Sequence, residues 1–167
     1  NRHVIDGAIA VRVKLQDGKW SDDTELLAED EKNDVALISV KPAPTVTPVV
    51  LGDSENVTVG EHILTIGNPL GLEHTLTDGL VSSRRLFDGR PMIQMSVPVS
   101  PGNSGGPVFD MHGHVVGIAT LQVGGGLFGR AQNLNMAAPI NQLKNIVRPP
   151  YAERRKFGSA SVKPQTW

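Results

Sequence analysis

The chain has 167 residues, of which 16 are Lys or Arg, 17 are Asp or Glu and none is cysteine. A net charge near zero argues against a protein that binds nucleic acid along its phosphates, and the lack of cysteine excludes disulfides, zinc ribbons and thiol nucleophiles. No stretch approaches the roughly 20 apolar residues that a membrane-spanning helix needs.

Most of the sequence reads as short strands separated by turn residues. Asp17-Gly18, which follows an alternating segment, is a strong hairpin signal, and His112-Gly113 divides the longest candidate strand into two arms. The expected strands span residues 11–15, 34–40, 62–66, 75–83, 92–97, 108–123 and 134–138.

One helix is expected near the end of the chain. From Pro139 to Val147 the apolar residues recur at the spacing of one helix face, and Pro149-Pro150 then ends the pattern. The residues after Tyr151 are polar and read as a loose tail. Short strands followed by a single helix predict an all-β barrel or sandwich, and a weak break over residues 52–60 divides it into two halves.

The segment 101–107, with the sequence PGNSGGP, is the most informative for chemistry. Its glycines allow backbone conformations that other residues resist, so Ser104 could expose its hydroxyl while neighbouring amides point into one small space. Acyl transfer needs such amides, because they stabilise the oxyanion of the transition state. The structural alternative is a glycine-rich turn in which Ser104 bonds only to its own backbone.

A nucleophilic serine needs a base, and the base needs an orienting acid. Of the five histidines, His112 and His114 flank a turn glycine, and His62 and His74 have no evident partner. His3 precedes Val4-Ile5-Asp6-Gly7. Asp34 is the unusual carboxylate, because it leads directly into an apolar strand and would need a hydrogen-bond partner there. Its alternative role is a cap at the strand edge.

Seven segments occur in the order seen in the HtrA/DegP-type serine proteases of the chymotrypsin-like clan: RHVIDGA, NDVALI, VGEHILTIGNPLGL, TLTDGLVSS, SPGNSGGPVFD, GHVVGI and NMAAPI. The resemblance runs from about residue 3 to residue 148. The order His, Asp, Ser along the chain is also that of chymotrypsin. The resemblance implies an all-β, two-barrel chymotrypsin-like fold with a C-terminal helix.

The resemblance also implies the roles of the site residues. Ser104 would be the nucleophile, His3 the general base and then acid, and Asp34 the residue that fixes the imidazole tautomer. The amides of Gly102 and Ser104, aided by Asn103, would form the oxyanion hole. The expected activity is a serine endopeptidase that hydrolyses unfolded or exposed segments of proteins through an acyl-enzyme, without a metal or other cofactor.

Residues that match the wall of the family's primary specificity pocket are uncharged. They are Val99, Ala137 and Ala138. An apolar pocket without an acidic residue favours a small or medium aliphatic side chain at P1, the substrate residue on the N-terminal side of the cleaved bond, and it offers nothing that would bind Arg or Lys. The expected partners are therefore polypeptides.

The family has strands ahead of the histidine, whereas this chain has two residues there. We therefore expect an incomplete first barrel over residues 1–53, a second barrel with the serine loop and helix over 54–148, and a polar tail over 149–167. Too few residues remain for the PDZ domain that often follows in the family. Family trimers form largely through the upstream segment, so a homotrimer and an extracytoplasmic location, such as the bacterial periplasm, are expectations from the family alone.

A rival hypothesis is a pseudoprotease or fragment that binds peptides without cleaving them. Two other patterns are set aside. Residues 124–129 fit the G-x-G-x-x-G dinucleotide pattern, but no helix follows them as that site requires. His112 and His114 could ligate a metal, but no third ligand is evident.

Overall fold

The computed structural model describes residues 1–41, 47–68, 74–121, 134–144, 146–147 and 155–158. These residues belong to two compact units, Asn1–Pro48 with Leu143–Thr166, and Val49–Gln142. The structure divides the chain after Pro48 and after Gln142, a few residues before the predicted divisions after residues 53 and 148. Among the described residues, no helix is both long and apolar enough to cross a membrane.

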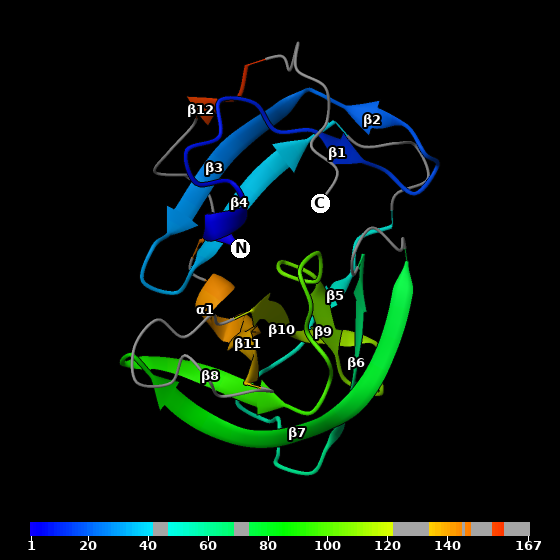
Figure 1. The fold of residues 1–167 in the computed structure, drawn as a ribbon, viewed down its shortest axis with the longest axis vertical. Coiled ribbons are helices and arrows are strands. Elements are labelled where there is room, and N and C mark those ends of the chain that lie inside the picture. Colours follow the sequence, from blue (N-terminus) through cyan, green and yellow to red (C-terminus); the bar gives the residue numbers. More distant parts are fainter. Residues whose placement is uncertain (42–46, 69–73, 122–133, 145, 148–154, 159–167) are drawn as a thin grey trace. The chain divides into compact units, whose positions relative to one another are not determined.

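The unit Val49–Gln142 is a closed six-stranded antiparallel barrel (Figure 1). The strands follow one another in the order β11-β8-β7-β6-β9-β10, and β10 pairs with β11 to close the ring. A seventh strand, β5, pairs in parallel with β10. The bounds are β5 Val50–Leu51, β6 His62–Gly67, β7 Thr75–Phe87, β8 Arg90–Met95, β9 Pro107–Phe109, β10 His114–Leu121 and β11 Asn135–Pro139.

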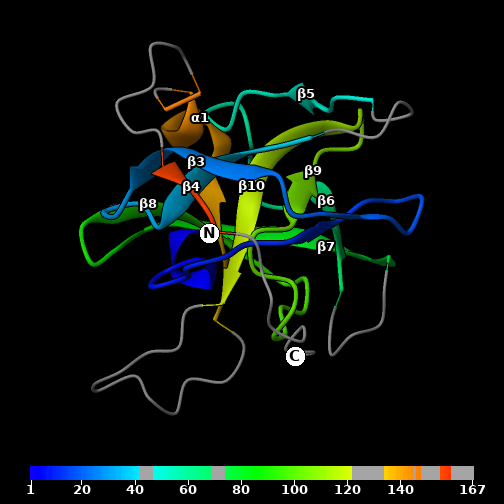
Figure 2. The same cartoon turned by 90° about the horizontal axis from the view of Figure 1, so that it is seen from above.

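Local sequence explains two of the barrel's hairpins. Asp88 and Gly89 join β7 to β8 with φ of 50° and 71°, the left-handed pair that a two-residue hairpin turn needs. The predicted hairpin at His112-Gly113 is also confirmed, because β9 and β10 pair there and Gly113 has a φ of 81°. Figure 2 shows β10 along its length beside β9 and β11.

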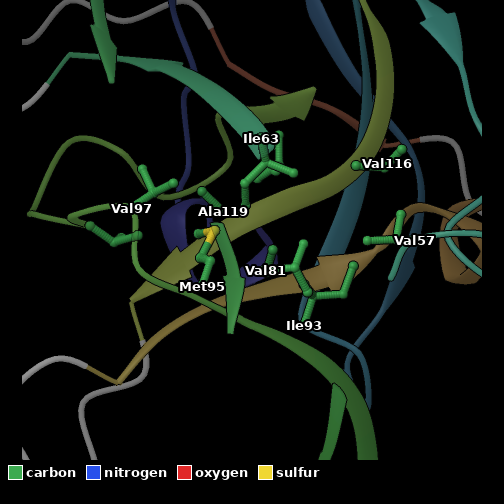
Figure 3. Close-up of a cluster of buried hydrophobic side chains, with 11 residues drawn as sticks. Val57, Ile63, Val81, Ile93, Met95, Val97, Val116 and Ala119 are labelled. Carbon is green, nitrogen blue, oxygen red and sulfur yellow. The ribbon is translucent and has the colours of Figure 1, made fainter. Parts of the chain in front are cut away.

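The hydrophobic core lies inside the barrel (Figure 3). Alternate residues of each strand point inward, so strands from distant parts of the chain contribute to one cluster. Each fully buried aliphatic side chain contributes roughly 1.5–3 kcal/mol to folding. The cluster consists of Val57, Ile63, Val81, Ile93, Met95, Val97, Val99, Val108, Val116, Ala119 and Ala137.

The other unit contains a three-stranded sheet in the order β12-β3-β4 and a two-stranded hairpin, β1-β2. A short 3-10 turn, η1, precedes them. Leu26, Ala28 and Val35 are buried on this sheet. The bounds are η1 Arg2–Val4, β1 Val13–Lys14, β2 Trp20–Ser21, β3 Thr24–Asp30, β4 Val35–Val40 and β12 Arg155–Lys156.

The helix expected over residues 139–147 is much shorter in the structure. Pro139 belongs to β11, because Gly117 pairs with it, and α1 covers only Ile140–Leu143. The amides of Ile146 and Val147 both donate to the Leu143 carbonyl, at 2.9 and 3.1 Å. These are an i→i−3 and an i→i−4 bond, so turn hydrogen bonds follow α1, although the α-helix itself ends at Leu143.

The structure also has strands that the sequence did not indicate, and each forms by pairing with a neighbouring strand of its sheet. β3 has a polar composition and forms against β4, and β12 forms against β3 within the segment 149–167, for which the sequence predicts a tail. Phe157 is buried there, and its amide donates to the Thr24 carbonyl at 3.2 Å. Sequence periodicity does not detect a two-residue strand whose partner lies far away along the chain.

Candidate active site

His3 and Asp34 lie together in the unit Asn1–Pro48. The ring Nδ1 of His3 is 2.7 Å from Oδ2 of Asp34, and the His3 main-chain amide donates to Oδ1 of the same carboxylate at 2.9 Å. A carboxylate only accepts hydrogen bonds, so Nδ1 carries the proton and Nε2 is left as the basic nitrogen. This contact meets the requirement for an oriented general base.

The turn between β3 and β4 presents the Asp34 carboxylate. Asp34 has a φ of 56°, in the left-handed region that Asp and Asn tolerate better than most residues. Its carbonyl accepts the amide of Arg2 and the side chain of Asn1, both at 3.1 Å. The Asp34 side chain is 16% exposed and that of His3 48%. The acid is therefore fixed and shielded, while the imidazole stays accessible.

The serine loop lies in the barrel unit and consists of two consecutive turns. Asn103 donates to the Ser100 carbonyl and Gly106 to the Asn103 carbonyl, each at 2.9 Å. The third residue of each turn is a glycine, Gly102 with φ 101° and Gly105 with φ 88°. Both are therefore type II turns, which need a positive φ at that position, and Pro101 suits the second position of the first turn. The sequence SPGNSGG encodes this local shape directly.

Further hydrogen bonds fasten this loop to the barrel. The Gly105 amide donates to the Ala119 carbonyl at 2.9 Å, and the Ala119 amide to the Gly106 carbonyl at 2.8 Å. On the other side, the Asn68 amide donates to the Gly102 carbonyl at 3.3 Å. β10 and the end of β6 therefore restrain the loop from two directions.

The loop's main-chain hydrogen bonds show which of three amides are engaged within the protein. Asn103 uses its amide within the first turn, and Gly105 and Gly106 use theirs within the barrel. In the part of the chain that the structure describes, the Gly102 amide donates to no other residue. The Ser104 amide points away from the Asn103 carbonyl, because a trans peptide directs its N–H and C=O in opposite directions. Gly102 and Ser104 are the two predicted donors.

Asn103, the third residue predicted for the oxyanion hole, has a different environment. Its side chain is only 4% exposed, and its Nδ2 lies 3.4 Å from the Pro98 carbonyl, to which it donates. Its main-chain amide is bound to Ser100. Both groups are therefore directed towards the residues just ahead of the loop.

A pocket of about 590 Å³ opens beside the serine loop within the barrel unit. Val99 is among its lining residues, and none of the described lining residues is charged. Ala137 and Ala138 do not line it, and they are 0% and 1% exposed on β11. The lining residues are Ser82, Gln94, Met95, Ser96, Pro98, Val99, Ser100 and Asn135.

Asn135 is a pocket residue that the sequence did not single out. Its Oδ1 accepts the amide of Val99 at 3.1 Å and so fixes the pocket wall ahead of the serine loop. The two residues are 36 positions apart, and no sequence pattern connects them. The remaining patterns add no further centre. Residues 124–129, which fit the dinucleotide pattern, lie outside the described residues. In the described ranges, no three or more acidic or histidine side chains are grouped to bind a metal ion.

Comparison with known proteins supports the family resemblance. Residues 1–118 match the model of the trypsin-like peptidase domain family. A probable periplasmic DegP-like serine endoprotease of Halomonas elongata is 40% identical over 152 residues, which cover 87% of this chain and 31% of that protein. The putative serine protease HhoA of Synechocystis is 36% identical over 159 residues, with coverages of 87% and 38%.

Two further matches agree with this. The periplasmic serine endoprotease DegP of Escherichia coli is 33% identical over 153 residues, covering 87% of this chain and 31% of that protein. The solved structure of the HtrA-type protease AlgW with decapeptide superposes with a TM-score of 0.76 at 29% identity, covering 87% of this chain and 45% of that one. The chain spans roughly a third of the length of the curated relatives it matches.

These matches confirm the predicted all-β, chymotrypsin-like two-barrel fold and the resemblance to HtrA and DegP proteases. The family match covers the His3–Asp34 pair and the serine loop in one continuous stretch of residues. This chain therefore belongs to the trypsin-like peptidase domain family, and its relatives in that family are serine endoproteases of the DegP/HtrA type.

Proposed function

We propose that this chain is the proteolytic part of an HtrA-type serine endopeptidase, with His3, Asp34 and Ser104 as its catalytic triad. The observation that carries the proposal is the His3–Asp34 contact at 2.7 Å, in a chain whose family match also includes the type II serine loop. Cleavage of unfolded or exposed polypeptide segments is the expected reaction. The decapeptide that accompanies AlgW in its solved structure supports polypeptides as the substrate class.

The chemistry follows from the roles of the three side chains. Ser104 Oγ attacks the scissile carbonyl while Nε2 of His3 accepts its proton, and Asp34 stabilises the imidazolium that forms. The tetrahedral oxyanion is bound by the amides of Gly102 and Ser104. The imidazolium then protonates the leaving amine, which departs and leaves an acyl-enzyme. Water activated by His3 attacks this ester and releases the acid product and the free Ser104 hydroxyl.

The specificity pocket is proposed to be the space beside the serine loop, with Val99 in its wall. Its described lining combines Met95, Pro98 and Val99 with five uncharged polar residues, and no described lining residue is charged. A charged P1 side chain would therefore lose hydration without gaining an oppositely charged partner. We expect preference for small or medium aliphatic P1 residues in a peptide library with a varied P1 position. A preference for Arg, Lys or Glu would contradict this part of the proposal.

The names of the relatives bear on the location of this protein. Several are named periplasmic, which supports an extracytoplasmic location for this protein. A homotrimer stays a prediction from the family, and sedimentation of the full-length protein would test it.

The nucleophile is tested by labelling with a fluorophosphonate probe, which reacts with activated serines. We expect labelling of the full-length protein that is lost in Ser104→Ala and in His3→Ala. Ser83→Ala, at a half-buried serine of β7, is the matched control and should keep full labelling. A folded protein that binds peptides but takes up no probe would instead favour the rival hypothesis, a peptide-binding pseudoprotease.

A further inference from the structure

The end of β6 lies directly against the serine loop. A Cβ built on Gly67 would be 2.3 Å from Oδ1 and 3.2 Å from Cα of Asn103. A Cβ on Gly106 would be 2.7 Å from the Ile66 carbonyl oxygen. Real Cβ atoms do not approach other atoms this closely, so the main chain of β6 and the loop are in contact at both places. Only glycine fits at these two positions without movement of the loop or of the Asn103 side chain.

The Asn103 side chain fills the space above Gly67. It is 4% exposed, and its Nδ2 donates to the Pro98 carbonyl at 3.4 Å. Its Oδ1 is buried and has no hydrogen-bond partner in the described part of the chain. A buried carbonyl oxygen without a donor is unfavourable for folding, so an apolar side chain of the same shape would suit stability better. The amide at this position therefore indicates a role in the function of the loop.

The neighbouring main-chain bonds explain what that role is. The peptide between Gly102 and Asn103 is bound at both ends, its carbonyl by the Asn68 amide at 3.3 Å and its N–H by the Ser100 carbonyl at 2.9 Å. Its plane is therefore fixed relative to the end of β6. The two predicted oxyanion donors, Gly102 and Ser104, lie immediately on either side of Asn103. A rotation at Asn103 would turn the Ser104 amide, and a shift of the bound peptide would move the Gly102 amide that precedes it.

We propose that Gly67 and Asn103 form an interlock that positions the amides of Gly102 and Ser104 for the developing oxyanion. Neither residue touches the reacting atoms, so both are positioning residues. The inference rests on the proposed function, since it concerns the oxyanion hole of the same reaction. The packing of Asn103 over Gly67 sets the geometry of the hole, and the hydrogen bond to Pro98 fixes the rotation of the side chain.

The direct test is Gly67→Ala, which places a methyl group where the Asn103 side chain lies. Loss of one oxyanion donor lowers kcat by about 10²–10³-fold. We expect a loss of at least about 100-fold in kcat with KM nearly unchanged, because the interaction is made only in the transition state. Binding of a peptidyl boronate, whose tetrahedral adduct occupies the oxyanion hole, should weaken in parallel.

Two further variants separate positioning from general destabilisation. Gly52→Ala is the matched control, because its Cβ would also be crowded, 3.0 Å from the His114 Cβ, but it lies away from the serine loop. It should lower the melting temperature and leave kcat close to that of the wild type. Adding Asn103→Ala to Gly67→Ala removes the clashing amide, and we expect about tenfold recovery of kcat, as for directly coupled residues.

Each other outcome contradicts the interlock. Wild-type kcat in Gly67→Ala, a change confined to KM, or an equal loss in Gly52→Ala would overturn it. If Gly67→Ala does not fold, Asn103→Ala alone decides, since it creates space in place of a clash. We expect about a tenfold lower kcat from it, and an unchanged kcat would overturn the interlock. Failure of the proposed function is distinguishable, because the wild-type protein would then not react with the fluorophosphonate.

Discussion

Two Asp–His pairs in this molecule have nearly the same geometry. Asp34 accepts the main-chain amide of His3 at 2.9 Å and lies 2.7 Å from its Nδ1. Asp110 accepts the main-chain amide of His114 at 2.8 Å and lies 3.3 Å from its Nδ1. In both pairs one carboxylate oxygen binds the backbone and the other faces the imidazole of the same residue.

The two pairs differ in origin. Asp110 and His114 are four residues apart, and the tight β9–β10 turn brings them together, with the His112 amide as another donor to Asp110. Asp34 and His3 are 31 residues apart, and tertiary structure alone joins them. A carboxylate that orients a histidine can therefore also arise from a local turn. It indicates catalysis only together with a nucleophile, and the proposed function assigns Ser104 to the first pair.

The largest expected effect comes from replacing the acid of the first pair. Asp34→Asn preserves the side-chain shape and tolerates the same positive φ, but its amide favours the wrong imidazole tautomer. We expect kcat for peptide hydrolysis to fall about 10⁴-fold while the protein stays folded. Asp110→Asn is the matched control and should leave kcat unchanged. Comparable losses in the two variants would remove the distinction between the pairs.

A smaller effect is expected from shortening the buried valine that lies next to each pair in the sequence. Val35 follows Asp34 and Val115 follows His114, and they are 1% and 2% exposed. Truncation to Ala removes two methyl groups and leaves a cavity, so each variant should lose about 1–3 kcal/mol of unfolding free energy in urea titrations. Val35→Ala should also lower kcat, because Asp34 loses its support. If Val115→Ala reduced kcat as much as Val35→Ala, the claim that Val35 specifically supports Asp34 would be wrong.

The smallest expected effect is the pH dependence of the second pair. Burial by itself would raise the pKa of Asp110, but the amides of His114 and His112 and the attraction of the His114 ring outweigh it and leave that pKa below its usual value. A carboxylate with a lowered folded pKa stabilises the fold above its unfolded pKa, about 3.9, and loses this contribution as pH falls through the folded value.

Thermal unfolding of the wild type and Asp110→Asn measures this contribution. The wild type should be slightly the more stable at about pH 5 to 7, and the difference should shrink as the pH drops below about 3.9. A difference that stays constant down to about pH 2 would show that the charge of Asp110 does not contribute.

Much of the barrel was predictable because its signals are local. Strand β6 and the hairpin between β9 and β10 have alternating residues bounded by turn glycines, and the expected ranges match them closely. The helix prediction was wrong in length, since Pro139 pairs in the barrel and α1 ends at Leu143. Strands β3 and β12 were missed, because a polar strand gains its stability from its neighbours and not from its own sequence.

The order of residues along the chain was sufficient to indicate the family and a glycine-rich loop around Ser104. Pro101, Gly102 and Gly105 specify two type II turns through their own backbone preferences, which act over three or four residues. Only the tertiary structure shows which carboxylate binds His3, which side chain accepts the Val99 main-chain N–H and which glycine packs against Asn103. Those contacts join residues 31 to 36 positions apart, so they depend on strand pairing and packing, which local preferences do not encode.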